Sequence, residues 1–557
     1  MKKILALCLT AALVLPGCVK VDNSLGKALV DNSLLYDTYT VEFPLEEIQL
    51  KMSDRLSGYS DSHLTIGAIR DETFGLTTRA AAFPLIPALD TLDLGKDPVA
   101  VSFSIYFEGD TVSVCDKSQE RIFQNIYITE LLEPLPLEDT RCTQEILHGT
   151  ELITEGLPVY DGSGPLAVRF TQEFAQKYVD NLQLLGMFFD DDDDDDDDDI
   201  IDELLKDHVN YSAYVAALPG IYIETEEPDG FGGRINLFDF SCLSVSNNYY
   251  YRNDNIGRLT VNSEWDGVRK DSTFIFVPGE MDFINEMLYI DNNTGFSQYC
   301  FNRTTHETMP GKAEDKILVE GGGGLKPVIL ASELQEKTRA AIARVGGDPD
   351  KAIIAKATIS LPYEMPEDYE EMNFFPSVLS PTICTALKDE DEVLHYTFAG
   401  LSDASVSTEN QGDIDRSNLW YAPDITYHLQ ELLGRQDLTT ATDADIWLLT
   451  IHSEQVAQAS GSAADNSYLQ SMIYASYYQS LYGGGYGYGG YGYGSGYNSY
   501  SNYYNYMMLS QMMAAASQQT YTVTTELDKD RYYRAILCGP NSTRKPSFQV
   551  SFAIPKK

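Results

Sequence analysis

The sequence predicts a mainly β protein of two or three β-sandwich-like domains, with a few inserted helices and low-complexity loops. Short runs rich in Val, Ile, Tyr and Phe recur between Gly, Asp and Pro, and Pro98–Val114 is a clear example. Alternation of apolar and polar residues in such runs is typical of half-buried strands, and two packed sheets bury their apolar faces. The 557 residues are 43% hydrophobic and 11% aromatic, enough to bury cores, and the length suggests about three domains.

Two segments break this pattern and predict helices. Phe170, Phe174, Tyr178 and Leu182 lie four residues apart and would form one apolar helical stripe. In a second segment, starting near Ser332, Ser332 and Gln335 have the spacing of a capping box, and the Gly346-Gly347 pair can end the helix in a left-handed conformation.

Changes in composition divide the chain into six expected parts. They are a signal peptide (1–17), a lipid-anchored tether (18–36), an N-terminal β-rich domain ending in a helix (37–186), an acidic linker (187–210), a central β-rich domain (211–389) and a C-terminal β-rich region (390–557) with a Tyr/Gly-rich insertion (482–506).

The first residues indicate export. Lys2 and Lys3 precede the apolar run Ile4–Leu15, which is too short to cross a bilayer. The run ends in LPGC, which resembles a bacterial lipoprotein box and implies that Cys18 becomes the lipidated, palmitate-bearing N-terminus. Several acyl chains would make the anchoring lasting. The alternative is an ordinary signal peptide with an accidental cysteine.

Net charge and cysteine spacing disfavour some classes of partner and of metal site. Eighty-four acidic and thirty-nine basic side chains give a net charge of −45, which disfavours nucleic acid as a partner. The sequence contains no CxxC pair, so zinc ribbons are disfavoured, while export permits disulfides. Isolated thiols and at least one disulfide both remain open for the six cysteines after Cys18, which are Cys115, Cys142, Cys242, Cys300, Cys384 and Cys538.

Ten consecutive aspartates, Asp190–Asp199, form the centre of the acidic linker. Adjacent carboxylates repel one another and keep a chain extended and solvated. A calcium loop needs spaced ligands and usually a glycine at the bend, and this run has neither. A solvated linker is the main expectation, with loose divalent-cation binding and recognition by a basic partner as alternatives.

No motif assigns a catalytic, cofactor or metal residue. The histidines lack HxH or HExxH spacing, and no GxSxG elbow occurs. The run GGGGLKP (321–327) lacks the GK[ST] ending of a phosphate loop and is interpreted as a turn. Glu364, Glu367 and Asp368 could in principle supply the paired carboxylates of a glycoside hydrolase, although 84 acidic residues make such pairs inevitable.

Aromatic clusters give a better case for binding, because sugar rings stack on tyrosine and tryptophan. The candidates are Tyr249–Tyr251, Trp420-Tyr421 and Tyr486–Tyr506 within the insertion 482–506, in which dense glycine favours a flexible loop. The alternative is that strand aromatics are core or cross-strand partners and that the Tyr/Gly loop is a spacer.

Several long phrases together resemble a family of uncharacterised Bacteroidetes lipoproteins that carry a domain of unknown function. The resemblance covers most of the mature chain and implies an outer-membrane lipoprotein without implying an activity. Its placement on the periplasmic side or the cell surface is undecided. The phrases that carry it are DNSLGKALVDNS, LSGYSDSHLTIGAIRDETFGLTTRAAAFPL, GIYIETEE, EGGGGLKPVI, AIIAKATISLPYEMPEDYE and RAILCGP.

The expected function is therefore a non-enzymatic, lipid-anchored cell-envelope protein with a binding or structural role. The membrane is reached through the lipid on Cys18, no cofactor is assigned, and a glycan, a surface polymer or an envelope protein is the expected partner. Two alternatives remain: a polysaccharide-active hydrolase with paired carboxylates, and a scaffold subunit of a secretion or transport complex.

Overall fold

A computed structural model gives the fold, which is mainly β with several sheets and few helices, as the sequence predicts. Cys18, the acidic linker and the Tyr/Gly-rich insertion lie outside the described residues. The structure describes residues 36–60, 63–87, 94–136, 141–185, 211–239, 243–246, 249–252, 257–281, 296–297, 300–388, 394–401, 403, 411–435, 438, 442–457 and 521–556.

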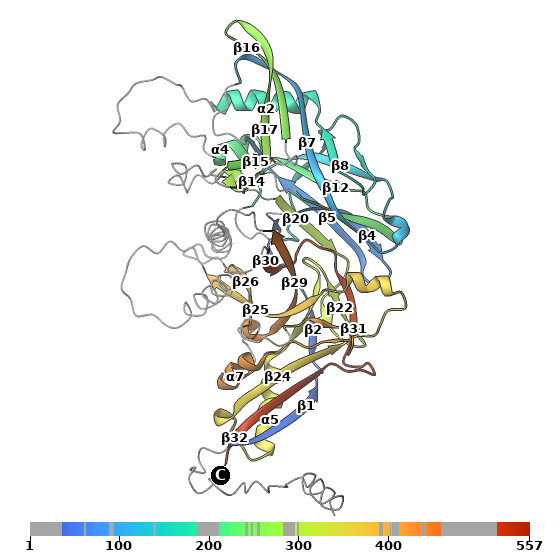
Figure 1. The fold of residues 1–557 in the computed structure, drawn as a ribbon, viewed down its shortest axis with the longest axis vertical. Helices are drawn as coiled ribbons and strands as arrows, with labels where there is room; N and C mark the ends of the chain where they lie inside the picture. Colours follow the sequence, from blue (N-terminus) through green and yellow to red (C-terminus); the bar gives the residue numbers. More distant parts are fainter. Residues whose placement is uncertain are drawn as a thin grey trace, which may run out of the picture.

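The strands fall into two halves, stacked along the long axis of the molecule in Figure 1. The upper half contains β3 (Tyr59–Ser60), β4 (His63–Asp71), β5 (Gly75–Phe83), β6 (Leu85–Pro87), β7 (Lys96–Val114), β8 (Gln124–Leu131), β9 (His148–Leu152), β10 (Val159–Tyr160), β11 (Leu166–Arg169), β12 (Ile221–Thr225), β13 (Gly232–Asp239), β14 (Leu243–Ser246), β15 (Tyr249–Arg252), β16 (Gly257–Trp265), β17 (Val268–Pro278), β18 (Glu280–Met281), β19 (Phe296–Ser297) and β20 (Cys300–His306).

The lower half combines the first two strands with the last third of the chain. It contains β1 (Tyr36–Pro44), β2 (Ile48–Met52), β21 (Gly311–Lys312), β22 (Lys316–Glu320), β23 (Leu325–Ile329), β24 (Ile353–Pro362), β25 (Val378–Lys388), β26 (Leu394–Gly400), β27 (Ile414–Asp415), β28 (Trp420–Tyr421), β29 (Ile446–Ala457), β30 (Tyr521–Leu527), β31 (Arg534–Cys538) and β32 (Ser547–Pro555).

Strand pairing corrects the expected domain boundaries. A 14-stranded sheet in the upper half contains strands from both the 37–186 and the 211–389 block. β12, which follows the acidic linker, pairs with β8 and β5, and β13 pairs with β4 and β7. The chain therefore returns to the same sheet after residues 187–210, because the edges left open by β8 and β4 need partners.

The lower half joins the two ends of the described chain. β1 and β32 pair antiparallel over nine residues, and β24 pairs with the other edge of β32 in a five-stranded sheet, β1-β32-β24-β28-β27. A seven-stranded sheet has the path β21-β2-β23-β29-β25-β26, with β30 paired to β29. The expected 390–557 region is thus completed by strands from residues 36–52 and 311–388.

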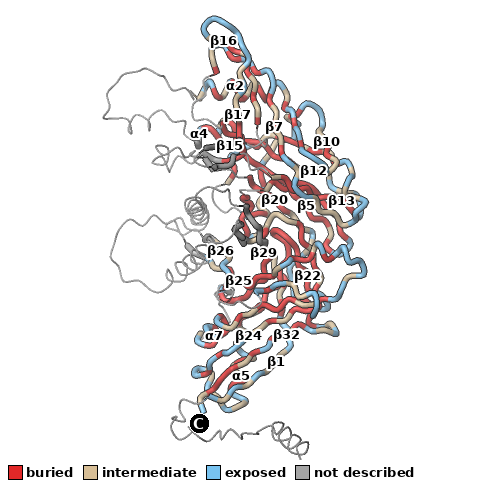
Figure 2. Tube along the Cα trace, in the orientation of Figure 1, coloured by how far each residue is buried: buried red, intermediate tan, exposed pale blue. Residues whose placement is uncertain are grey.

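The described α-helices are α2 (Gln172–Leu185), α4 (Tyr211–Ala217), α5 (Ala331–Arg344) and α7 (Thr426–Gly434), and short 3₁₀ turns are η2 (Lys117–Gln119), η4 (Pro349–Lys351), η5 (Tyr369–Phe374) and η6 (Thr442–Ala444). The predicted stripe of α2 is confirmed, since Phe174, Tyr178 and Leu182 are buried. They pack against β7, where Phe103 lies 5.0 Å from the ring centre of Tyr178. Figure 2 shows the buried residues running along the sheets.

The predicted capping box of α5 is wrong, whereas its glycine stop is confirmed. The N-cap is Leu330, without a side-chain hydrogen bond, and the N–H of Ala331 donates to Asp445 Oδ1 at 3.1 Å. A carboxylate beside β29 therefore replaces the local serine. At the other end, Gly346 has φ 78°, and Gly347 donates to Ile342 O at 3.0 Å.

The five described cysteines, Cys115, Cys142, Cys300, Cys384 and Cys538, are free thiols. Cys242 lies outside the described residues. The question of a disulfide, which the sequence left open, is thus answered for these five: each of them is a free thiol.

The core of the upper half allows a test of packing. Tyr178 is 1% exposed, and its hydroxyl has no hydrogen-bond partner among the described residues. Tyr178→Phe keeps the ring contacts and removes a buried polar group, so we expect unfolding free energy to rise by about 1 kcal/mol. Tyr160→Phe is the matched control, because the Tyr160 hydroxyl donates to Gly164 O at 2.8 Å. Removing this hydroxyl should lower the unfolding free energy by a similar amount. Urea unfolding of both variants measures the difference, and a loss of stability in Tyr178→Phe would contradict the prediction.

Candidate functional site

The described histidines, which lack a metal-binding or catalytic spacing in the sequence, have local contacts in the structure. His148 stacks on Tyr222 with ring centres 3.9 Å apart, and the Nε2 of the buried His428 lies 3.1 Å from Ala444 O. Within the described ranges, no group of three His, Cys, Asp or Glu side chains is placed to hold a metal ion. Nor is any helix there long and apolar enough to cross a membrane.

The candidate carboxylates and strand aromatics have local structural roles. Glu364, Glu367 and Asp368 are exposed, and Asp368 caps η5 by accepting from the N–H of Glu370 at 2.9 Å. Tyr421 is buried, and its hydroxyl donates to Pro376 O at 2.7 Å. The backbone of Tyr249–Tyr251 lies in β15, but these side chains lie outside the described set.

The structure instead brings buried polar side chains together where the two halves meet. The centre is Gly321–Gly324, between β22 and β23, which forms the turn that the sequence predicts, with Gly324 N donating to Gly321 O at 3.1 Å. A Cβ on Gly322 would lie 2.6 Å from Arg79 Nη2, and one on Gly323 would lie 2.7 Å from Cys142 Sγ. Gly322 also has φ 54°, a conformation that favours glycine. The turn therefore packs backbone directly against side chains of the upper half.

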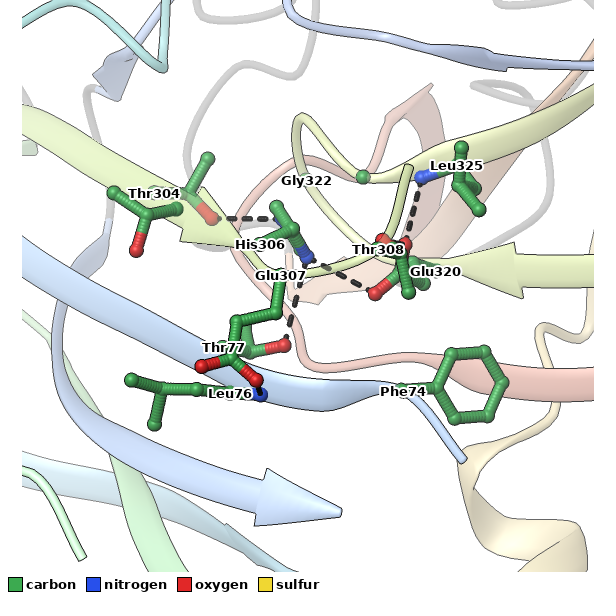
Figure 3. Close-up of polar contacts among 12 residues, drawn as sticks. Phe74, Leu76, Thr77, Thr304, His306, Glu307, Thr308, Glu320, Gly322 and Leu325 are labelled. Carbon is green, nitrogen blue, oxygen red and sulfur yellow. Dashed lines mark hydrogen bonds and ion pairs between the residues drawn. The ribbon is translucent and has the colours of Figure 1, made fainter. Parts of the chain in front are cut away.

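His306 and Glu320 form the first pair of this junction (Figure 3). His306 Nδ1 lies 3.2 Å from Glu320 Oε1, and its Nε2 lies 3.0 Å from Thr304 Oγ1. Burial lowers the pKa of His306, which favours the neutral ring. With the Nδ1 proton assigned, the ring donates to the carboxylate and accepts from Thr304.

Glu320 remains the charged partner despite its burial. Burial raises the pKa of this carboxyl, but hydrogen bonds from His306, from the Thr308 hydroxyl and from Leu325 N outweigh it and hold the pKa below the ordinary value. The Leu325 N–H donates to Oε2 at 2.9 Å. The carboxylate thus ties the end of β20 to both strands that flank the glycine turn.

Lys326 is fully buried and is the second residue of β23, just after the glycine turn. Its ammonium donates to Ser53 Oγ and Gly322 O, each at 3.1 Å, and to Glu320 O. Burial lowers the pKa of Lys326 to about 7. Three oxygen acceptors therefore surround an amine that titrates near neutrality.

A segment between β30 and β31 completes the junction from the other side. Lys529 donates to Tyr59 O, and Lys529 O accepts from Arg79 Nη1 at 3.0 Å. Asp530 accepts from Asn302 Nδ2 at 2.9 Å, and Arg534 forms an ion pair with Asp71. The segment 528–534 thus carries charged side chains of the lower half into the upper sheet.

Arg79 is the least satisfied group at the junction. It is 2% exposed, and its Nε and Nη2 have no hydrogen-bond partner among the described residues. Burial lowers the pKa of Arg79, and the nearby Asp530 opposes this effect. The carboxylates of Asp528 and Asp530 hydrogen-bond to other groups, and they favour the charged form of Arg79 only through space.

The groups at this junction can bind protons, and they can hold the two halves together. Most of these groups hydrogen-bond to other groups of the protein. His306 bonds to Glu320, Lys326 bonds to carbonyl oxygens, and Asp530 bonds to Asn302. Sequence reasoning missed all of them, apart from naming the glycine run as a turn. One signal was present: Lys326 stands inside the apolar strand LKPVI, where a lysine needs buried acceptors.

Comparison with known proteins adds no relative. No family model matches the chain, and neither curated proteins nor solved structures give a significant match. The assignment of function therefore depends on the sequence features and on the geometry described above.

The depressed pKa of Lys326 predicts a pH-dependent stability. Between about pH 7 and the ordinary value of 10.5, the unfolded chain binds a proton that the native chain does not, so native stability rises with pH. Lys326→Met removes this contribution. The stability of the unsubstituted chain minus that of the variant should therefore increase by about 1 to 2 kcal/mol between pH 7 and 8.5.

Urea unfolding at these two pH values measures the change. The range stops below pH 9 because burial raises the pKa of Cys142 to about 11 and its thiol would then contribute with the opposite sign. Lys312→Met is the control, because the Lys312 ammonium is half exposed and pairs with Glu47 at the surface. A difference for Lys326→Met that stays constant over this range would contradict the prediction.

Proposed function

We propose that the protein is a non-enzymatic, lipid-anchored component of the cell envelope whose β scaffold presents the Tyr/Gly-rich insertion to a glycan or surface polymer. One observation carries this proposal. Ala457 and Tyr521, which border the segment containing the insertion, are a paired position of the β29–β30 hairpin. The aromatic segment is thus attached at both ends to one point of the scaffold.

The base of this hairpin is firmly held. β29 pairs with β25 over six positions and with β23 over two, and Leu448 and Leu449 are buried. Thr450 and Asp528 exchange two hydrogen bonds, Asp528 N to Thr450 O at 3.0 Å and Thr450 Oγ1 to Asp528 O at 2.9 Å. A rigid base supports a presenting role, because a binding segment needs a fixed point of attachment.

The proposal of a non-enzymatic role is supported by the buried junction. Its titratable groups are covered by the two halves, and their hydrogen bonds link strands to one another. Such an arrangement suits a junction that holds the two halves together. The signal peptide and Cys18 support the envelope location, and tyrosine-rich sequence supports contact with sugar rings.

The location is tested by protease shaving of intact cells, with an antibody against the C-terminal strands. We expect Cys18→Ala to release the chain from the membrane fraction, because it removes the thiol that we propose carries an acyl chain. Digestion of the anchored chain on intact cells is the expected result for a surface role. Protection until the outer membrane is broken would contradict contact with an external polymer and would favour the scaffold alternative.

The role of the insertion is tested by replacing residues 458–520 with Asn-Gly, which suits a two-residue hairpin turn between Ala457 and Tyr521. The variant should keep its cooperative unfolding and lose at least tenfold in binding to a glycan array and to insoluble cell-wall glycan. A second variant keeps the length and glycines but changes the tyrosines of 482–506 to serine, and it should lose binding equally. Binding by either variant at the level of the unsubstituted chain would overturn the glycan proposal.

A further inference from the structure

The outer edge of β1 is a nine-residue strand edge without a partner among the described strands. β1 pairs with β32 on one side only, and it begins the five-stranded sheet. Figure 1 shows it at the rim of the lower half, beside β32. An unpaired edge of this length presents a row of backbone donors and acceptors.

The register with β32 identifies which groups face outward. Leu45 N donates to Pro546 O at 3.0 Å, which continues the β1–β32 register by one position. Because hydrogen bonds alternate along a strand, the odd-numbered residues of β1 point their backbone groups to β32. Thr38, Thr40 and Glu42 therefore direct their N–H and C=O groups to the free edge.

An incompletely covered apolar row lies along the same strand. Tyr39, Val41 and Phe43 pack against the core of the lower half and are only half-buried. The Tyr39 ring stacks on Phe552 at 5.7 Å, and the Phe43 ring stacks on Phe548 at 6.4 Å. Their partners on β32 are fully buried, so the exposure begins at the edge strand.

The edge of β17 is also partly free among the described strands, and charged side chains protect it from pairing. β6 covers only residues 276–278 of β17, and the uncovered part carries Arg269, Lys270 and Asp271 in succession. Charged side chains on an edge are a common protection against pairing. β1 has Asp37 and Glu42, five residues apart, and Pro44 as its last residue, and it is otherwise rich in Thr, Tyr, Val and Phe.

We propose that the β1 edges of two copies of this chain pair antiparallel about Thr40, joining their five-stranded sheets into one. In this register Thr40 faces Thr40 of the second copy, and Tyr39 faces Val41, an aromatic and β-branched pair that stabilises sheets. Thr38 faces Glu42, and Asp37 faces Phe43, so no two carboxylates are opposed. The pairing uses the outward backbone groups of Thr38, Thr40 and Glu42, whereas Pro44 lacks an N–H and its carbonyl accepts from Lys337 Nζ at 2.6 Å. The three outward-facing residues match those of a second copy, which is why a second copy fits this edge.

Charge makes this pairing weak and dependent on salt. Each copy carries −45, and a single strand pair is smaller than a standard stable interface. Screening shortens the repulsion to about 8 Å at 0.15 M salt, against about 30 Å at 0.01 M. We therefore expect the full-length chain, purified in mild detergent, to be monomeric at low salt and to form dimers in sedimentation at 0.15 M salt and above.

Cysteine cross-linking of the full-length chain tests the register. Facing residues of an antiparallel pair have Cα atoms about 5.5 Å apart, within reach of a disulfide. Thr40→Cys should therefore form a covalent dimer on mild oxidation, at least fivefold faster than the unsubstituted chain. Thr38→Cys is the matched control on the same edge, because its two copies would be about 14 Å apart.

A mixture provides the decisive comparison. Thr38→Cys and Glu42→Cys should each fail to cross-link alone and should cross-link when mixed, because these two positions face each other. Circular dichroism and unfolding midpoints verify that each variant is folded. The proposal is overturned if Thr40→Cys gives no more dimer than the unsubstituted chain, if Thr38→Cys alone reacts as fast, or if the unsubstituted chain sediments as a monomer at both salt concentrations.

Discussion

The architecture depends on hydrogen bonds and ion pairs that buried and half-buried charged groups form between its two halves. The segment 528–534 carries Lys529, Asp530 and Arg534 into the upper sheet, where they meet Tyr59 O, Asn302 and Asp71. A buried charge that loses its partner is strongly destabilising, whereas a matched pair approximately offsets its desolvation. The two halves therefore fit in one arrangement, and the glycines of 321–324 are small enough to let the backbone of this turn contact side chains of the upper half.

Local features of this fold could be predicted from sequence because they depend on neighbouring residues. The stripe of Phe174, Tyr178 and Leu182 predicts α2, and alternation predicts β7 close to its observed bounds. The pairing of strands could not be predicted, because alternation identifies a strand and not its partner. Thr40 and Ser551, which share a hydrogen bond, are 511 positions apart. For the same reason the sequence predicts a domain boundary at the acidic linker, although the strands before and after it share one sheet.

The junction was harder to predict than the fold. His306, Glu320 and Lys326 belong to different strands, and nothing in their spacing indicates that a carboxylate and two carbonyl groups converge on them. The capping of α5 failed for a related reason, because Asp445 supplies the acceptor that a local serine was expected to provide. In both cases the polar partner comes from a distant element. The sequence shows only that a polar group needs a hydrogen-bond partner, as Lys326 does in an apolar strand.

The hairpin that carries the insertion and the junction form one connected unit. Closing a hairpin costs chain entropy, and this cost grows slowly with the number of intervening residues. Seven paired positions of β29 and β30 and the Thr450–Asp528 hydrogen bonds offset that cost at the base. Asp528 also begins the segment that enters the upper sheet, and its carboxylate accepts from the Tyr533 hydroxyl at 2.6 Å. A ligand held by the insertion would therefore act on β30, which leads directly into the segment that joins the two halves.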